Sequence, residues 1–313
     1  MDASKIVAVT AIALSAVSSA WAQGWYPSKW GAADEVGAAN YMTPARTLAA
    51  AQLVKTGKVY SLGITVTTST PAYPPRTCSL YIVQPGQTGS ADGLGPTHTT
   101  YNDDILNCWN GIGTQIDGLG HIGIGDRYYN GNKWGEFATM GGLKKLGVDK
   151  VPPMVARGVL LDMAGFFGVD VVKEGTAFNQ AEIEGAAKKQ GVEIRQGDVV
   201  IFHTGWLSLI DKDPKRYGSV EPGLGREGAR YLVGKGVVAV GADTWGVEAI
   251  PFEAGAGVFE VHQILLPMSG TYILENIATA ELAKDKAWEF MFVLGQNKYQ
   301  GAVQAMINPV AIR

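Results

Sequence analysis

The pattern of apolar and polar positions predicts alternating helices and strands along the chain. Thr43 caps a helix that begins at Pro44, where the missing N–H costs nothing, and continues to Lys55. Residues 58–68, rich in Val, Ile, Tyr and Thr, predict a strand. Residues 69–110 are rich in Pro, Gly, Thr and Asn, which indicates a long loop with short strands. Loops of this length inside a compact domain are usually functional.

The second half of the chain reads as an α/β unit. Asn179 and Glu182 form a capping box for a helix that runs to Gln190. The nearly unbroken apolar run at 197–202 is typical of a strand buried on both faces. Further elements are expected as a turn between paired strands at 125–131, a strand at 155–163, a helix at 222–234 and a strand at 236–240. The strand–helix–strand order favours parallel pairing, and the lack of a linker favours one domain over 23–313.

The N-terminal residues carry the signs of a signal peptide. Lys5 precedes an apolar run at 6–17, and Ala20 and Ala22 satisfy the small-x-small spacing for signal peptidase. Cleavage is expected after Ala22, so residues 1–22 are removed and the mature protein is periplasmic or secreted. No other segment approaches 18 apolar residues, and the mature form is expected to have no membrane span.

Composition narrows the class of protein. Hydrophobic residues make up 46% and charged residues 18%, as in an ordinary soluble globular protein. The net charge is −3 and no Lys/Arg-rich run occurs, so no nucleic-acid partner is expected. In an oxidising compartment, Cys78 and Cys108 could form a disulfide or remain two buried thiols.

The segment 111–121 holds the strongest chemical signal. It places Gln115, Asp117 and His121 close together among glycines. On an extended segment the first two side chains leave the same side, and a borderline ion such as Zn²⁺ or Mn²⁺ accepts this ligand set. The alternative is a glycine-rich turn with one hydrogen-bonded Asp and one buried His.

Other polar groups stand near strand ends or in apolar runs. His203 follows a buried strand, so it either lines a pocket or is a satisfied structural histidine. Glu275 interrupts an apolar run, where burial is costly without a metal or proton donor. Asp243 and Glu248 follow a strand end, where they could belong to a site or could equally cap a helix. Neither a Gly-x-Ser-x-Gly elbow nor a Walker loop nor a dinucleotide fingerprint is present.

Segment 111–121 resembles the motif His-x-Gly-Thr-His-x-Asp-x-x-x-His of the metal-dependent cyclase family. That family includes bacterial kynurenine formamidase, isatin hydrolase and trans-dienelactone hydrolase. The segment departs at Gly111 and Gln115, where the family has histidines, and is similar to the longer-chain branch that carries Gly-Thr-Gln. The resemblance is collinear over residues 24–313, through segments at 157–162, 197–206, 243–248, 262–266 and 273–276.

The resemblance implies a fold and a set of site residues. The fold would be a single α/β domain with a mixed β-sheet flanked by helices, of the swivelling β/α type. One Zn or Mn ion would be held by the side chains of Gln115, Asp117, His121 and His262. His121 (if it is not only a ligand) and Glu275 would be the catalytic acid/base groups. Substrate binding is assigned to His203, Trp206 and Trp245.

The function implied is hydrolysis of a small carbonyl compound. The substrate would be a cyclic amide, an imide, a lactone or an N-formyl arylamine, attacked by a water that the metal activates. An alternative is an exported non-catalytic protein of the same fold that binds a small molecule, because two family histidines are missing. The resemblance also suggests a homodimer or larger homo-oligomer.

Overall fold

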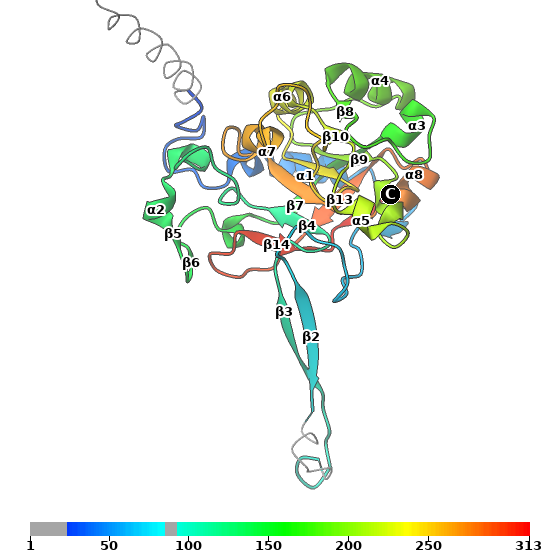
Figure 1. Cartoon of the computed structure of the whole chain (residues 1–313). Coiled ribbons are helices and arrows are strands. Elements are labelled where there is room, and N and C mark those ends of the chain that lie inside the picture. The colour runs from blue at the N-terminus through cyan, green and yellow to red at the C-terminus, as the bar shows by residue number, and fades with distance from the viewer. Residues whose placement is uncertain (1–23, 85–92) are drawn as a thin grey trace, which may run out of the picture.

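A mixed nine-stranded sheet forms the centre of the protein (Figure 1). The computed structural model describes residues 24–84 and 93–313, so the expected signal peptide lies outside the described residues. The strand order is β1 (Val59–Ser61), β15 (Val310–Ile312), β13 (Glu289–Leu294), β7 (Met154–Asp162), β9 (Val199–His203), β11 (Ala239–Ala242), β12 (Tyr272–Glu275), β4 (Gln115–Asp117) and β14 (Gln304–Met306). The expected α/β domain with a mixed sheet is confirmed.

The middle of the sheet is parallel and both sides are antiparallel. Strands β7, β9, β11 and β12 pair in parallel, as the strand–helix–strand pattern predicts. Strand β13 begins the antiparallel pairing on one side, and β4 pairs antiparallel with both β12 and β14 on the other. The central strands are buried on both faces, which explains their continuous apolar runs.

Helices pack around the central sheet, and short strand pairs form outside it. The helices are α1 (Pro44–Ala51), α2 (Trp134–Phe137), α3 (Met163–Phe167), α4 (Gln180–Gln190), α5 (Pro214–Tyr217), α6 (Arg226–Lys235), α7 (Glu260–Leu265) and α8 (Ala280–Lys284). The minor strand pairs are β8 (Ala177–Phe178) with β10 (Gly223–Leu224), and β5 (Ala138–Thr139) with β6 (Gly142–Leu143). Helices α1, α4 and α8 contact β7, and α7 contacts β12. No helix of the described residues is long and apolar enough to cross a membrane.

Several element boundaries differ from the sequence prediction. Helix α1 was expected to continue to Lys55, but it ends at Ala51 and residues 52–53 form a turn. The strand expected at 58–68 pairs with β15 over only three residues and then leaves the sheet edge. Strands paired around the turn at 125–131 are absent from the described residues; Arg127 instead forms isolated bridges with Ile124 and Lys133. Helix α6 starts four residues later than expected, because Gly223 and Leu224 pair with β8.

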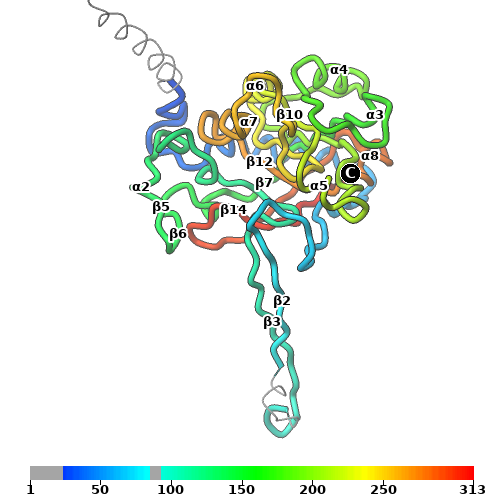
Figure 2. Tube along the Cα trace, viewed as in Figure 1, coloured from blue at the N-terminus to red at the C-terminus, as the bar shows by residue number. Residues whose placement is uncertain are grey.

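The long loop folds into a two-stranded hairpin that projects from the body (Figures 1 and 2). Strand β2 (Cys78–Val83) pairs antiparallel with β3 (Asp103–Cys108), and Cys78 lies opposite Cys108 in this register. These two cysteines form a disulfide, which resolves the alternatives that the sequence left open. The disulfide closes the base of the hairpin, directly before segment 111–121.

Candidate metal centre

Strand β4 brings two of the predicted ligands to one face of the sheet. Gln115 and Asp117 alternate with Ile116, whose side chain is fully buried in the core. In the neighbouring strand β12, Glu275 lies directly opposite Gln115. The Gln115 amide nitrogen donates a hydrogen bond to Glu275 Oε2 over 2.5 Å. Alternation along β4 and its register with β12 therefore place three polar side chains together, each at most 4% exposed.

Two histidines complete the cluster from other segments. The backbone N–H of His121 bonds to the Gly118 carbonyl, so a turn, rather than a helix, carries this ring back toward Asp117. His121 Nε2 lies 3.8 Å from Asp117 Oδ2. His262, in helix α7, places Nε2 3.9 Å from the same oxygen and 3.4 Å from Glu275 Oε1. The structure thus gathers all five predicted metal and acid/base residues.

Glu248 holds the other ring nitrogen of His262. Its Oε1 lies 2.5 Å from His262 Nδ1 and also accepts the backbone N–H of that residue. The sequence left Glu248 open between a site group and a helix cap, because nothing in its local pattern shows the contact with helix α7. A carboxylate that orients an imidazole in this way is the usual outer partner of a metal-bound histidine.

Burial and neighbouring charges alter the acidity of these groups. Desolvation opposes the charged form of His262, but hydrogen bonds to Glu248 and Glu275 outweigh it and raise the pKa to about 10. Burial, reinforced by the charge of Asp117, raises the pKa of Glu275. Burial also lowers the pKa of His121, which favours its neutral form. The cluster thus holds protons that a cation would displace.

The donor atoms fit a divalent cation. Gln115 Oε1 and Asp117 Oδ2 are buried and have no hydrogen-bond partner within the described residues. One donor atom each from Asp117, His262 and Glu275 lies within 4.8 Å of the others. Buried oxygens without partners are costly, and a cation bound to them would remove that cost. Carboxylate, amide and imidazole donors suit zinc or manganese.

A cavity of about 190 Å³ opens onto this cluster. It is lined by Tyr73, Arg76, His121, Ile122, Trp245, Gly246, Phe259, His262 and Glu275. Trp245 was expected at the site. Tyr73, Arg76 and Phe259 were not, although Tyr73 and Arg76 belong to the long loop interpreted as functional. That loop has no periodic pattern, so its sequence does not show which of its residues reach the cavity.

His203 and Trp206 do not line this cavity. His203 Nδ1 shares a hydrogen bond with Thr279 Oγ1 over 2.7 Å and lies 3.4 Å from Asp243. Trp206 is fully buried, and its indole N–H donates to the Tyr217 carbonyl. Both contacts satisfy buried polar groups within the protein, as a structural role requires.

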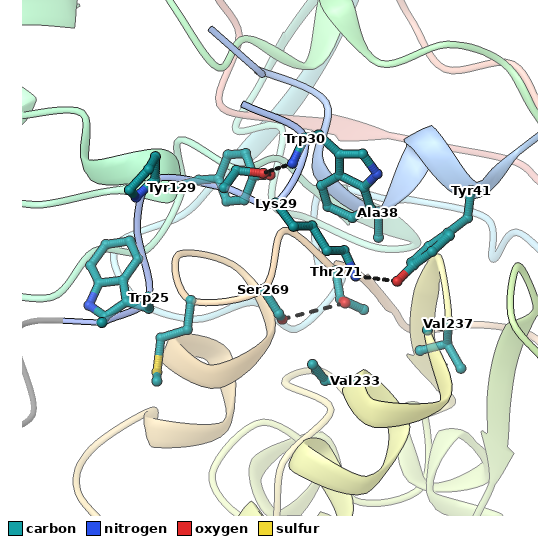
Figure 3. A pocket seen from close by; sticks show the side chains of 15 residues that line it. Trp25, Lys29, Trp30, Ala38, Tyr41, Tyr129, Val233, Val237, Ser269 and Thr271 are labelled. Atoms are coloured by element: carbon teal, nitrogen blue, oxygen red, sulfur yellow. Dashed lines mark hydrogen bonds between the residues drawn. The ribbon is translucent and has the colours of Figure 1, made fainter. Parts of the chain in front are cut away.

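A larger cavity of about 320 Å³ lies elsewhere, where the N-terminal segment meets helix α6 and the end of α7 (Figure 3). Its lining includes Trp25, Trp30 and Tyr41 but no Asp, Glu, His or Cys. Its one cationic side chain, Lys29, donates to the Tyr41 hydroxyl and lies 4.5 Å from the Trp30 ring centroid. Of these two cavities, only the smaller one is lined by groups capable of metal chemistry.

This chain is similar to known proteins in both sequence and fold. The family model described as "Putative cyclase" matches residues 60–249. The solved structure of a protein described as a novel cyclase is 32% identical, with a TM-score of 0.83 and coverage of 91% of this chain and 96% of that chain. Isatin hydrolase A from Ralstonia solanacearum has a similar fold at 18% identity, with a TM-score of 0.62 and coverage of 87% and 98%. No curated protein sequence matches.

Proposed function

The chain belongs to the cyclase family, and from this premise we propose that it is a metal-dependent hydrolase of small carbonyl compounds. The proposed reaction opens a cyclic amide, imide or lactone, or cleaves an N-formyl arylamine. One observation carries the proposal: the buried Asp117 Oδ2, which has no hydrogen-bond partner among the described residues, faces the Nε2 atoms of His121 and His262 beside an open cavity. The fold shared with isatin hydrolase A supports it.

Each side chain of the cluster has a proposed role. Gln115, Asp117, His121 and His262 would hold one zinc or manganese ion, which when bound would act as a Lewis acid toward the substrate carbonyl. Glu275 would take a proton from the attacking water and return it to the leaving nitrogen or oxygen. Burial raises the pKa of Glu275 toward the range in which a carboxyl group can do both.

A panel of substrates tests this function. Purified mature protein would be assayed against lactones, cyclic imides, cyclic amides and formylanilides, with and without a chelator. We expect turnover of at least one class, lost with the chelator and restored by zinc or manganese. Stoichiometric metal without turnover of any class would favour the non-catalytic binding protein, and a protein that takes up no metal would contradict the metal centre.

We also propose that a second copy of the chain covers the β2–β3 hairpin. The cross-strand pairs Leu80–Leu106 and Tyr81–Ile105 are each 55–56% exposed and occupy successive positions, so both faces of the hairpin are apolar. An isolated hairpin is marginally stable in water, and its open edges pair readily with an identical edge about a twofold axis.

Light scattering after size-exclusion chromatography tests this assembly. We expect a dimer or larger oligomer, which the double substitution Leu80→Lys and Leu106→Lys dissociates. Leu48→Lys, at a position 68% exposed on α1, is the matched control and should leave the mass unchanged. A monomeric wild-type protein at micromolar concentration would contradict the proposal.

Export is the third proposal, and the Cys78–Cys108 disulfide supports it because such bonds persist in oxidising compartments. The N-terminal sequence of the protein recovered from the periplasm or medium tests it. We expect Gln23 as the first residue; an intact N-terminus on a cytoplasmic protein would contradict export.

A further inference from the structure

Arg76 brings a permanent positive charge into the wall of the metal-site cavity. It lies between Tyr73 and the base of the hairpin, is half-buried, and lines the cavity together with His121 and Glu275. Its Nη1 donates to the Gly111 carbonyl over 2.8 Å. Within the described part of the chain, no carboxylate forms an ion pair with this guanidinium at 4.0 Å or less. Among the described residues only Nη1 has a hydrogen-bond acceptor, so most of the five N–H donors can bind an anion in the cavity.

The position of Arg76 depends on glycine at residue 111. A Cβ atom on Gly111 would lie 2.6 Å from Arg76 Nη1, 2.7 Å from its Cζ and 2.8 Å from Gln304 Oε1. Any side chain there would push the guanidinium away. This is also the first position at which segment 111–121 departs from the motif that it resembles. The guanidinium of Arg76 therefore occupies the space that a side chain at residue 111 would fill.

Aromatic rings form the rest of the cavity wall. Tyr73 stacks on Trp245, with ring centroids 5.8 Å apart and an interplanar angle of 28°. Phe259 meets Tyr73 edge-on at 6.1 Å. The backbone N–H of Trp245 donates to the fully buried Glu221, which fixes the loop that carries this ring. The cavity thus combines flat apolar walls with one guanidinium, a combination suited to a small planar ring that bears a carboxylate.

We propose that Arg76 binds the carboxylate of a small planar aromatic ligand. The inference rests on the proposed function. When water adds to the carbonyl carbon of a cyclic amide or lactone, the bond from that carbon to nitrogen or oxygen breaks. The leaving atom receives one proton of the water, the second proton passes to solvent, and the carbonyl carbon becomes a carboxylate. Arg76 binds this carboxylate of the ring-opened product, whereas hydrolysis of an N-formyl arylamine leaves no new carboxylate on the ring.

Binding of benzoate and of neutral benzamide to the metal-loaded protein tests Arg76 without turnover. Titration calorimetry should show that Arg76→Met weakens benzoate binding by about 10- to 100-fold, the usual effect of losing a charge-assisted hydrogen bond. Benzamide affinity and bound metal should not change. Arg76→Lys should recover part of the benzoate affinity, since it keeps the charge but loses the planar fork. Gly111→Ala should weaken benzoate binding while Arg76 remains in the chain.

Arg127→Met is the matched control, because Arg127 lies outside the cavity lining and bonds to the Gly131 carbonyl. It should leave both affinities unchanged. Equal benzoate affinity in wild type and Arg76→Met, equal losses for benzoate and benzamide, or no benzoate binding to wild type at millimolar concentration would each overturn the inference. These outcomes do not depend on hydrolysis, so they are distinguishable from failure of the substrate panel.

Discussion

Glu248 Oε1 lies 2.5 Å from His262 Nδ1, and this contact leaves Nε2 of the same ring to face Asp117 and Glu275. One buried carboxylate therefore selects which nitrogen of His262 points into the metal centre. The backbone N–H of His262 binds the same oxygen, so the start of helix α7 and the orientation of its imidazole are fixed together.

Glu248→Gln tests this positioning role. The amide can still contact Nδ1 but no longer offers a negative charge, so we expect metal affinity to fall about 10- to 100-fold. Metal competition with a chromophoric chelator measures the change. Glu193→Gln, at a side chain 78% exposed, is the matched control and should have no effect. Unchanged affinity in Glu248→Gln would show that His262 needs no such partner.

Asp117→Asn should abolish tight metal binding while the protein stays folded. The substitution keeps size but removes the negative charge that opposes the cation in a buried site. We expect sub-stoichiometric metal by elemental analysis and activity reduced by orders of magnitude, with a near-native circular dichroism spectrum. Asp126→Asn, at a side chain 59% exposed, is the control. Wild-type metal content in Asp117→Asn would mean that the centre is placed wrongly.

Glu275→Gln separates proton transfer from metal binding. If Glu275 is the acid/base group, the variant should retain bound metal and lose about 10²- to 10⁴-fold in kcat. Rates and metal content are measured on one preparation. Loss of the metal together with the rate would instead make Glu275 a ligand, consistent with its place beside Asp117 and His262.

Metal binding to the metal-free protein should release protons and tighten as pH rises. The pKa of His262 is raised to about 10, so at neutral pH its ring is protonated and must lose a proton to bind a cation. Each proton displaced makes affinity rise about tenfold per pH unit below that pKa. Calorimetry of zinc binding at pH 6.5 and 7.5, in buffers of different ionisation enthalpy, measures both effects. Affinity that is independent of pH would contradict the protonated state of His262.

The sequence predicted the parts of the site that local periodicity governs. Gln115 and Asp117 share a face because β4 is extended, and the buried carboxylate of Glu275 accepts a hydrogen bond from Gln115 in this neighbouring strand. His203 does follow a buried strand as expected, but partners from other segments, Thr279 and Asp243, satisfy it outside the cavity. Position at a strand end therefore did not suffice to place a residue in the site.

Contacts between distant segments were beyond the reach of sequence patterns. Arg76 reaches the cavity because the chain folds back at the disulfide-closed hairpin and because Gly111 leaves room for its guanidinium. Glu248 and His262 are 14 positions apart, and the chain between them includes the start of helix α7. Neither relation leaves a period or motif in the sequence. The overall α/β fold was predictable because its central strands are long apolar runs.

The central claim is that one metal ion at the Gln115–Asp117–His121–His262 cluster supports hydrolysis. The most direct measurement strips the protein with a chelator, returns zinc or manganese in steps, and follows bound metal and hydrolysis rate in the same samples. We predict no turnover without metal and a rate that rises in proportion to bound metal up to one equivalent, in wild type but not in Asp117→Asn. Undiminished turnover by the stripped protein, or metal-dependent turnover that survives in Asp117→Asn, would contradict the account.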